Sequence, residues 1–124
     1  MKKVIHTNNA PAAIGPYSQA VIIGDRLITS GQIPVDPATG EVPGDDITSQ
    51  AHQSMKNLIA ILEAAGTDQS KVLKTTCFLQ DMGDFAAFNA VYEQYLTEKP
   101  ARSCVAVAAL PKGVLCEVEA IAEL

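Results

Sequence analysis

Three residues near the C-terminal end of the chain carry the side chains best suited to chemistry: Arg102, Cys104 and Glu117. They lie in two short stretches of strand character, which are separated by the turn-forming segment 110–113 (Leu-Pro-Lys-Gly). A guanidinium, a thiol and a carboxylate are all ionisable, and each can contact a small molecule. These three residues are therefore the first candidates for a functional site.

Alternation along each stretch sorts these groups onto one face, because successive side chains of a strand point to opposite faces. Arg102 and Cys104 share a face in the first stretch, and Glu117 shares a face with Glu119 and Ile121 in the second. The opposite faces are apolar: Val105, Val107 and Ala109 in the first stretch, and Val118, Ala120 and Ala122 in the second. Each strand is thus expected to offer one face to a core and one face to ionisable groups.

A simple hairpin would keep the candidates apart. If the chain turned at residues 111–112, Glu117 would lie opposite Val107, and Arg102 would be roughly 16 Å away at ~3.3 Å per residue. Three alternatives remain: the two strands are not neighbours, Arg102 meets a Glu117 of another subunit, or no joint site exists. In the third case, Arg102 would form only a solvated ion pair at a strand end.

Length and composition describe one domain spanning residues 1–124, near the commonest domain size. The net charge of −5 and the lack of a basic run disfavour nucleic-acid binding. No apolar stretch approaches the ~20 residues that span a bilayer. Three cysteines without CxxC spacing fit reduced thiols in the cytoplasm, not a disulfide framework or a zinc site.

The elements that must position the candidates follow from hydrophobic periodicity. Strands are predicted over 4–7, 18–23, 26–30 and 70–79, with a hairpin turn at residues 24–25 and the last of these strands central in the sheet. A helix begins at Ile47, with Asp45 or Asp46 as its N-cap and Gly66 just past its end.

A second helix is predicted to open at Asp84, whose side chain can accept hydrogen bonds from free backbone N–H groups. It carries an aromatic stripe that includes Phe85, Phe88, Tyr92 and Tyr95. Asn89 lies inside this helix, so it either faces water or contacts something polar.

The resulting order, β-β-β-α-β-α-β-β, predicts an α+β two-layer sandwich: a six-stranded mixed sheet with two helices on one face. The other face would be bare, and we expect it to carry the row of Arg102 and Cys104. An exposed sheet face of this size is a large patch, so a closed homo-oligomer is expected to bury it.

Common catalytic motifs are absent. The chain has no glycine-rich phosphate loop, no GxSxG and no HExxH, and His6 and His52 are too few for a metal cluster. Catalysis would therefore rest on arginine, glutamate, tyrosine, backbone groups and water, with no cofactor and no metal.

Four separated segments resemble the Rid family, also called YjgF or L-PSP: 9–20 (NAPAAIGPYSQA), 29–34 (TSGQIP), 101–105 (ARSCV) and 114–122 (VLCEVEAIA). The resemblance runs nearly end to end and is nearest to the RidA branch, enamine/imine deaminases that act on reactive products of pyridoxal-phosphate enzymes. It implies a chorismate-mutase-like fold whose last two strands are not neighbours. It also implies a homotrimer with three sites in clefts between subunits. The segment 97–99 is a few residues shorter than in typical members.

By position, the resemblance assigns the family's carboxylate-binding arginine to Arg102, a backbone contact to Cys104 and the water-holding glutamate to Glu117. Other positions that line the family's cleft match Tyr17, Ser30, Gly31 and Asn89. The implied reaction is hydrolysis of 2-imino acids, such as 2-iminobutanoate and 2-iminopropanoate, to 2-keto acids and ammonia.

Two other functions stay open. Older names of the family suggest an endoribonuclease or translation inhibitor, which the acidic charge disfavours. The chain could also be a non-catalytic sensor that binds small carboxylates through Arg102 without chemistry at Glu117.

Overall fold

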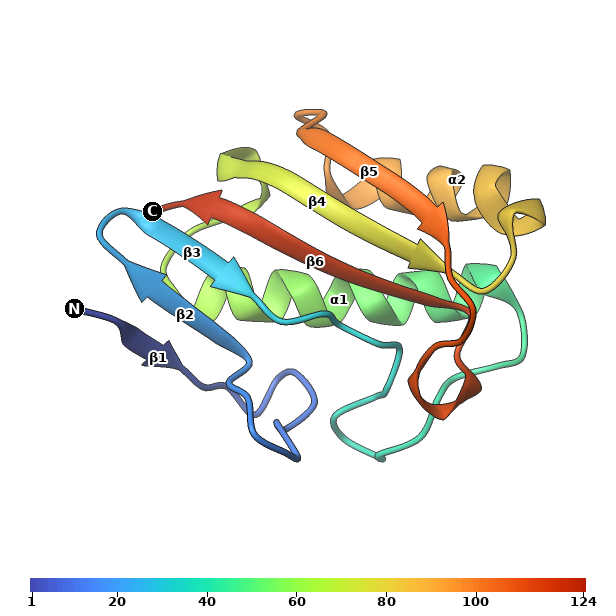
Figure 1. Cartoon of the computed structure of the whole chain (residues 1–124), viewed down its shortest axis with the longest axis horizontal. Coiled ribbons are helices and arrows are strands. Elements are labelled where there is room, and N and C mark those ends of the chain that lie inside the picture. The colour runs from blue at the N-terminus through green and yellow to red at the C-terminus, as the bar shows by residue number, and fades with distance from the viewer.

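A computed structural model, which describes residues 1–124, contains one mixed sheet with two helices packed on it (Figure 1). The strands are β1 (Lys3–Ile5), β2 (Ala20–Ile23), β3 (Arg26–Thr29), β4 (Val72–Leu79), β5 (Ala101–Ala106) and β6 (Cys116–Glu123). The helices are α1 (Ile47–Ala64) and α2 (Phe85–Tyr95), with short 3₁₀ turns η1 (Gln69–Lys71), η2 (Met82–Asp84) and η3 (Pro111–Gly113). The predicted order of six strands and two helices is confirmed.

The sheet order is β1-β2-β3-β6-β4-β5, and only the pair of β4 and β5 is parallel. The predicted hairpin joins β2 to β3 through Gly24, whose φ of 59° lies in the left-handed region that glycine adopts without strain. β4 lies inside the sheet, between β6 and β5, as its apolar sequence predicted. Figure 1 shows β4 lying between β5 and β6.

Helix α1 begins where the sequence predicts. The Asp46 carboxylate accepts a hydrogen bond of 2.9 Å from the Ser49 backbone N–H, which satisfies one free donor of the first turn. Gly66, with a φ of 84°, follows its end. The inward face of α1 is fully buried against the sheet and α2: Ala51, Met55, Leu58, Ile61 and Leu62.

Helix α2 departs from the prediction at its N-terminus. Asp84 occupies the N-cap position, but its side chain makes no capping hydrogen bond. The Asp81 carboxylate instead accepts from the Gly83 backbone N–H at 2.7 Å and caps the short turn η2 that leads into the helix. The aromatic stripe is real, since Phe88 and Tyr92 are buried.

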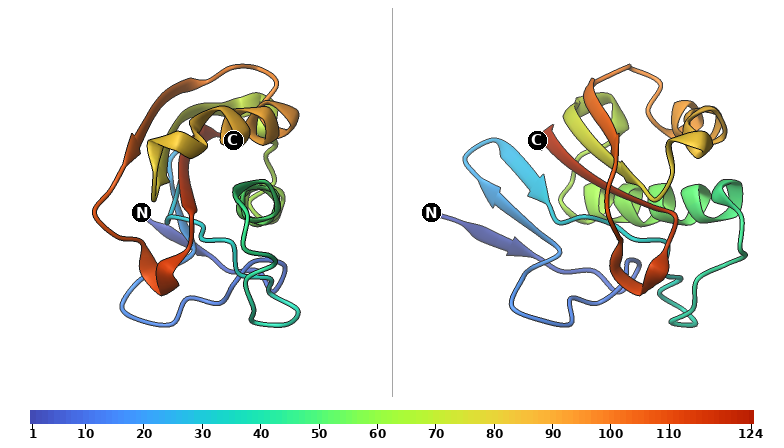
Figure 2. Two further views of the ribbon diagram at one scale, coloured as in Figure 1. Left: turned by 90° about the vertical axis from the view of Figure 1, so that its right-hand side faces the viewer. Right: turned by 45° about the vertical axis from the view of Figure 1, so that its right-hand side comes forward.

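Both helices lie on the same side of the sheet, which leaves the opposite face uncovered (Figure 2, left). That open face exposes apolar side chains from three strands, including Ile28 at 43%, Val105 at 46% and Ile121 at 38%. The two-layer sandwich with one bare face is therefore confirmed. Neither helix is long and apolar enough to cross a membrane.

Candidate active site

The strand order decides which faces the candidate residues occupy. Cys77 of β4 is in register with Cys104 of β5 on one side and with Val118 of β6 on the other. Residues in register point to the same face, and Val118 is completely buried beneath the helices. Arg102 and Cys104 therefore point to the helix-covered face, whereas Glu117 points to the open face. The prediction that Arg102 and Cys104 lie on the bare face is wrong.

Arg102 lies against α2. Its Nη1 donates a hydrogen bond of 2.7 Å to Oδ1 of Asn89. Asn89, the polar residue inside the helix, therefore contacts the guanidinium. The guanidinium carbon lies 4.8 Å from the ring centroid of Tyr92 and 5.5 Å from that of Phe85. At these distances the aromatic faces attract the cation. We call Arg102, Asn89 and Cys104 the arginine half-site.

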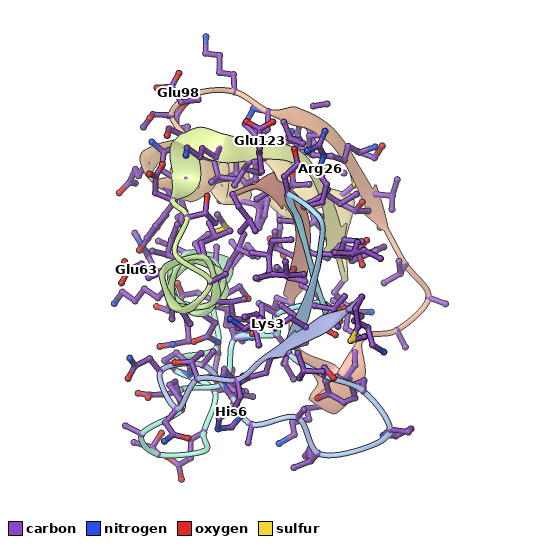
Figure 3. All side chains as sticks on the ribbon, turned by 90° about the vertical axis from the view of Figure 1, so that its left-hand side faces the viewer. Lys3, His6, Arg26, Glu63, Glu98 and Glu123 are labelled. Atoms are coloured by element: carbon purple, nitrogen blue, oxygen red, sulfur yellow. The ribbon has the colours of Figure 1, made fainter.

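No carboxylate neutralises Arg102. The only ion pairs in the chain join Arg26 to Asp25 and to Glu123, at the far end of β3 and β6, where Figure 3 shows Arg26 beside Glu123. Arg102 instead borders a hollow of about 340 Å³ beside α2, together with Asn89. Its guanidinium is therefore free to bind an anion from outside the chain.

Cys104 is half-buried beside Arg102. Burial raises the pKa of its thiol, and the Arg102 charge opposes that rise only in part, so the thiol stays protonated at neutral pH. β5 is also the edge strand of the sheet, which leaves backbone N–H and C=O groups along its outer side without sheet partners. A backbone contact from this strand suits the site better than thiol chemistry.

A bulge between β3 and β6 positions the second group of candidate residues. After Ile28 pairs with Ile121, the next bridge joins Gln32 to Val118, so residues 29–31 face only residues 119–120. The extra residue bends the chain after β3 and places Gly31 beside β6. Bulges of this kind commonly re-aim groups at functional sites.

Glu117 lies directly against the backbone of Gly31, because any Cβ at this position would collide with the Glu117 carboxylate. Burial raises the pKa of the Glu117 carboxyl above its usual value, and the charge of Glu119 on the same face raises it further. Glu117 takes part in no ion pair. It is a half-buried carboxylate without a cation to hold its charge.

Tyr17 and Gly31 line one hollow of about 290 Å³, and Ser30 directly precedes Gly31 in the chain. The Ser30 hydroxyl donates a 2.6 Å hydrogen bond to the Ser18 carbonyl, which ties the loop before β2 to the end of β3. Tyr17 is 52% exposed, and it lines a hollow of about 440 Å³ together with Ser30. We call Tyr17, Ser30, Gly31 and Glu117 the glutamate half-site.

Comparison with known proteins now identifies the family. The family model described as Endoribonuclease L-PSP matches residues 7–124. The chain belongs to the L-PSP family. The resemblance found in the four sequence segments is therefore confirmed.

Relatives of this L-PSP chain match it almost end to end. A RutC family protein of Pasteurella multocida is 60% identical over 127 residues, which cover 98% of each chain. The 2-iminobutanoate/2-iminopropanoate deaminase of Escherichia coli K12 is 58% identical over 126 residues, again 98% of each. The crystal structure of E. coli TdcF with bound serine superposes with a TM-score of 0.94 at 50% identity, covering 98% of both chains.

In this L-PSP chain, the contact between Arg102 and the aromatic stripe of α2 was not predicted from the sequence. Phe85 and Tyr92 belong to the predicted aromatic stripe, and the Arg102 guanidinium lies over both rings. The available signal was spacing: Phe85, Asn89 and Tyr92 follow one another at four and three residues, which places them on one helix face. An asparagine between two aromatic rings on such a face indicates that a polar side chain from another element packs there.

Gly31→Ala is expected to lower catalytic turnover sharply in an otherwise folded protein. The new methyl group would occupy the position of the Glu117 carboxylate and push that side chain away from the bulge. We expect kcat for imine hydrolysis to fall roughly tenfold or more, since displacing a reacting group by about 1 Å can cost up to a hundredfold.

Ala substitution of Gly24 is not a fair control, because Gly24 needs a positive φ. Gly83→Ala is better matched, since Gly83 has no positive φ and its new methyl group would meet only the exposed Asp81 carboxylate, no closer than 3.2 Å. Unchanged kcat in Gly31→Ala would show that Glu117 does not need its observed position.

Proposed function

We propose that this L-PSP-family chain is a 2-imino acid deaminase, which hydrolyses 2-iminobutanoate and 2-iminopropanoate to 2-keto acids and ammonia. The observation that carries the proposal is Arg102, a guanidinium with no carboxylate partner that is held in place by neutral groups. A 2-imino acid supplies the missing carboxylate. The near end-to-end identity with the E. coli deaminase of that name supports the same substrate class.

One chain cannot form the site by itself, because its two half-sites lie on opposite faces of the sheet. We infer that the chain assembles as a homotrimer, in which the arginine half-site of one subunit faces the glutamate half-site of the next. Three equivalent clefts result from such a closed ring. The open apolar face of the sheet, including Ile28, Val105 and Ile121, supplies the surface for this assembly.

The reaction needs positioning and one base. Arg102 would bind the substrate carboxylate through two hydrogen bonds, while Asn89 holds the guanidinium and the backbone at Cys104 orients the substrate. Glu117 would hold a water molecule and accept its proton as the water oxygen adds to the imine carbon. Return of that proton to the imine nitrogen gives a carbinolamine. Transfer of the carbinolamine's hydroxyl proton to the amino nitrogen, again by way of Glu117, then breaks the C–N bond, releases ammonia and leaves the keto acid. Each step uses groups of the chain and water, so no cofactor is needed.

Coupled turnover tests the activity directly. A threonine dehydratase releases 2-iminobutanoate, which also hydrolyses slowly in water without a catalyst. Adding the chain is expected to speed formation of 2-oxobutanoate above that background. A rate that does not depend on the concentration of the chain would refute the deaminase and favour a non-catalytic carboxylate sensor.

A mixture of two inactive variants tests the shared site. In a random trimer of Arg102→Ala and Glu117→Gln subunits, a wild-type arginine half-site meets a wild-type glutamate half-site in about one quarter of the clefts. We therefore expect roughly a quarter of the wild-type activity after the two variants are unfolded and refolded together. Refolding each variant separately provides the control, and a mixture that stays inactive would place both residues within one subunit's site.

Glu119→Gln is expected to move the acid limb of the pH profile to lower pH. Glu117 must be deprotonated to act as a base, so activity rises as pH increases through its pKa. Removing the Glu119 charge lowers that pKa, although burial, the larger cause, keeps it above the usual carboxyl value. A profile of kcat/KM between about pH 4 and pH 8 measures the shift, and a limb that moves upward would contradict it.

The family model's description also raises ribonuclease activity. The net charge of −5 and the absence of clustered lysines or arginines provide no surface that would attract a phosphate backbone. Salt-dependent RNA binding at physiological ionic strength would support the ribonuclease.

The three cysteines, all free thiols, suit a reducing compartment, and we infer a cytoplasmic protein.

A further inference from the structure

A buried pair of hydroxyl groups lies beneath the arginine half-site. The Tyr92 hydroxyl and the Thr75 hydroxyl are 2.6 Å apart, in hydrogen-bond contact. Thr75 is completely buried, and Tyr92 is only 7% exposed. Thr75 lies on β4 directly in register with Arg102 on β5. Thr75, the neighbour of Arg102 in the sheet, thus holds the hydroxyl end of the Tyr92 ring, and the Arg102 guanidinium lies over that ring.

This arrangement fixes the ring more firmly than packing alone. A phenylalanine would fill the same space but could not bond to Thr75, and it would leave the buried Thr75 hydroxyl without its Tyr92 partner, which is unfavourable. The paired hydroxyls therefore set the position of the Tyr92 ring relative to β4. Because β5 runs parallel to β4 in fixed register, the ring is also set relative to Arg102.

The guanidinium needs such a support. A free arginine side chain loses much of its rotamer entropy when it is immobilised on binding a ligand, and that loss weakens binding. Here the Tyr92 face, the Phe85 ring and the Asn89 oxygen already restrict it before any ligand arrives. An arginine that is ordered in advance binds a carboxylate at a lower entropic cost.

We propose that Tyr92, anchored by Thr75, is a positioning residue that orients Arg102 and thereby sets the affinity of the chain for the substrate carboxylate. The inference rests on the proposed function in one respect, the identity of that carboxylate. The contact between Tyr92 and Arg102 itself can be measured without any substrate.

The side chain of Arg102 can be observed directly. The chain contains only two arginines, Arg26 and Arg102, so a protein labelled with ¹⁵N-arginine gives two Nε–H signals, and Arg102→Lys assigns them. We expect ring currents from Tyr92 to shift the Arg102 signal, and Tyr92→Leu to move it toward the position of a free arginine. The Arg26 signal should stay in place. An Arg102 signal that does not move in Tyr92→Leu would overturn the proposal.

Kinetics provides the second measurement. Tyr92→Leu is expected to raise KM for the imino acid, and the dissociation constant of 2-oxobutanoate, by about 2- to 30-fold, the range that corresponds to one cation–π contact. The effect on kcat should be smaller, because the reacting water is held elsewhere. Tyr95→Phe is the matched control: its hydroxyl contacts His52 at 2.8 Å, away from Arg102, and its loss should leave KM unchanged.

The paired variants separate positioning from simple stability. Thr75→Val alone leaves the Tyr92 hydroxyl without a partner and should lower the melting temperature. The double variant Thr75→Val/Tyr92→Phe removes both hydroxyls at nearly constant shape and should recover most of that stability. We expect the KM of this double variant to lie above the wild-type KM even though its stability is recovered. A double variant with wild-type KM and a wild-type Arg102 signal would show that the hydroxyl pair only stabilises the core.

Failure of this inference can be told from failure of the proposed function. If the wild-type chain neither turns over 2-iminobutanoate nor binds 2-oxobutanoate, the function is wrong, and the NMR signal alone decides whether Tyr92 orients Arg102. If the wild-type chain is active and Tyr92→Leu keeps both its KM and its Arg102 signal, the positioning role is refuted while the deaminase stands.

Discussion

Arg102→Lys is expected to lose a hundredfold or more in kcat/KM for 2-imino acids while the protein keeps its fold and its assembly. Lysine keeps the positive charge, but it cannot offer two parallel hydrogen bonds to a carboxylate or lie flat on the Tyr92 ring. Two charge-assisted hydrogen bonds contribute about 3 kcal/mol or more, which corresponds to roughly two orders of magnitude in rate at low substrate.

The fold should survive because Arg102 makes no ion pair inside the chain. Its partners are a neutral amide and two aromatic rings, none of which becomes a buried charge when it leaves. Light scattering and a melting curve check the assembly and the fold, and dehydratase-coupled turnover checks the activity. Arg26→Lys, at the only other arginine, is the matched control. Wild-type kcat/KM in Arg102→Lys would remove the basis for the proposed carboxylate site.

Glu117→Gln is expected to lower kcat by about a hundredfold or more, in the range that general-base catalysis contributes. Glutamine matches the glutamate in size and keeps the contact with Gly31, but it cannot accept a proton from water at neutral pH. Because the substrate carboxylate is bound by Arg102, the affinity for 2-oxobutanoate should change little. The expected signature is a fall in kcat with a nearly constant dissociation constant.

The matched control lies on the same strand. Glu123→Gln alters a carboxylate at the end of β6 that pairs loosely with Arg26, at 3.8 Å, and it should leave turnover unchanged. Isothermal titration with 2-oxobutanoate and single-turnover rates separate binding from chemistry. Weaker keto-acid binding with an intact kcat would demote Glu117 from a proton acceptor to a binding group.

The two variants have different consequences because their sites differ electrostatically. Arg102 has a permanent charge and neutral partners, so its task is recognition. Burial raises the pKa of the Glu117 carboxyl, which makes it a stronger base toward water than an exposed glutamate, so its task is proton transfer. In the proposed trimer the two tasks belong to neighbouring subunits, and dissociation of the trimer would remove activity without unfolding any half-site.

Much of the fold could be predicted because its signals are local. The spacing of apolar residues from Ile47 and the cap at Asp46 specified α1, and the turn at Gly24 specified the first hairpin. Alternation in β6 correctly placed Glu117 and the core residue Val118 on different faces of the sheet, since adjacent side chains of a strand point to opposite faces. These features depend on residues a few positions apart.

The wrong prediction concerned a feature that is not local. Alternation in β5 separated Arg102 from Val105, but it could not tell which of the two faces the helices cover. Val105 is the more apolar residue and was placed on the core side, yet it is 46% exposed, and Arg102 packs on α2. The Phe85 and Tyr92 rings of α2 stabilise the Arg102 cation on the helix-covered face. This attraction outweighs the preference of an apolar side chain such as Val105 for the buried side.

By itself the sequence determined the elements, their order and the family, and it supplied the candidate residues for the chemistry, because each follows from short-range periodicity or from motifs of neighbouring residues. Only the tertiary structure decided that β4 lies between β5 and β6 and that Arg102 and Glu117 point to opposite faces. Strand pairing joins residues far apart in the chain through backbone groups that are alike at every position. Side-chain pattern therefore constrains which face each residue takes relative to its neighbours, but not which strands meet.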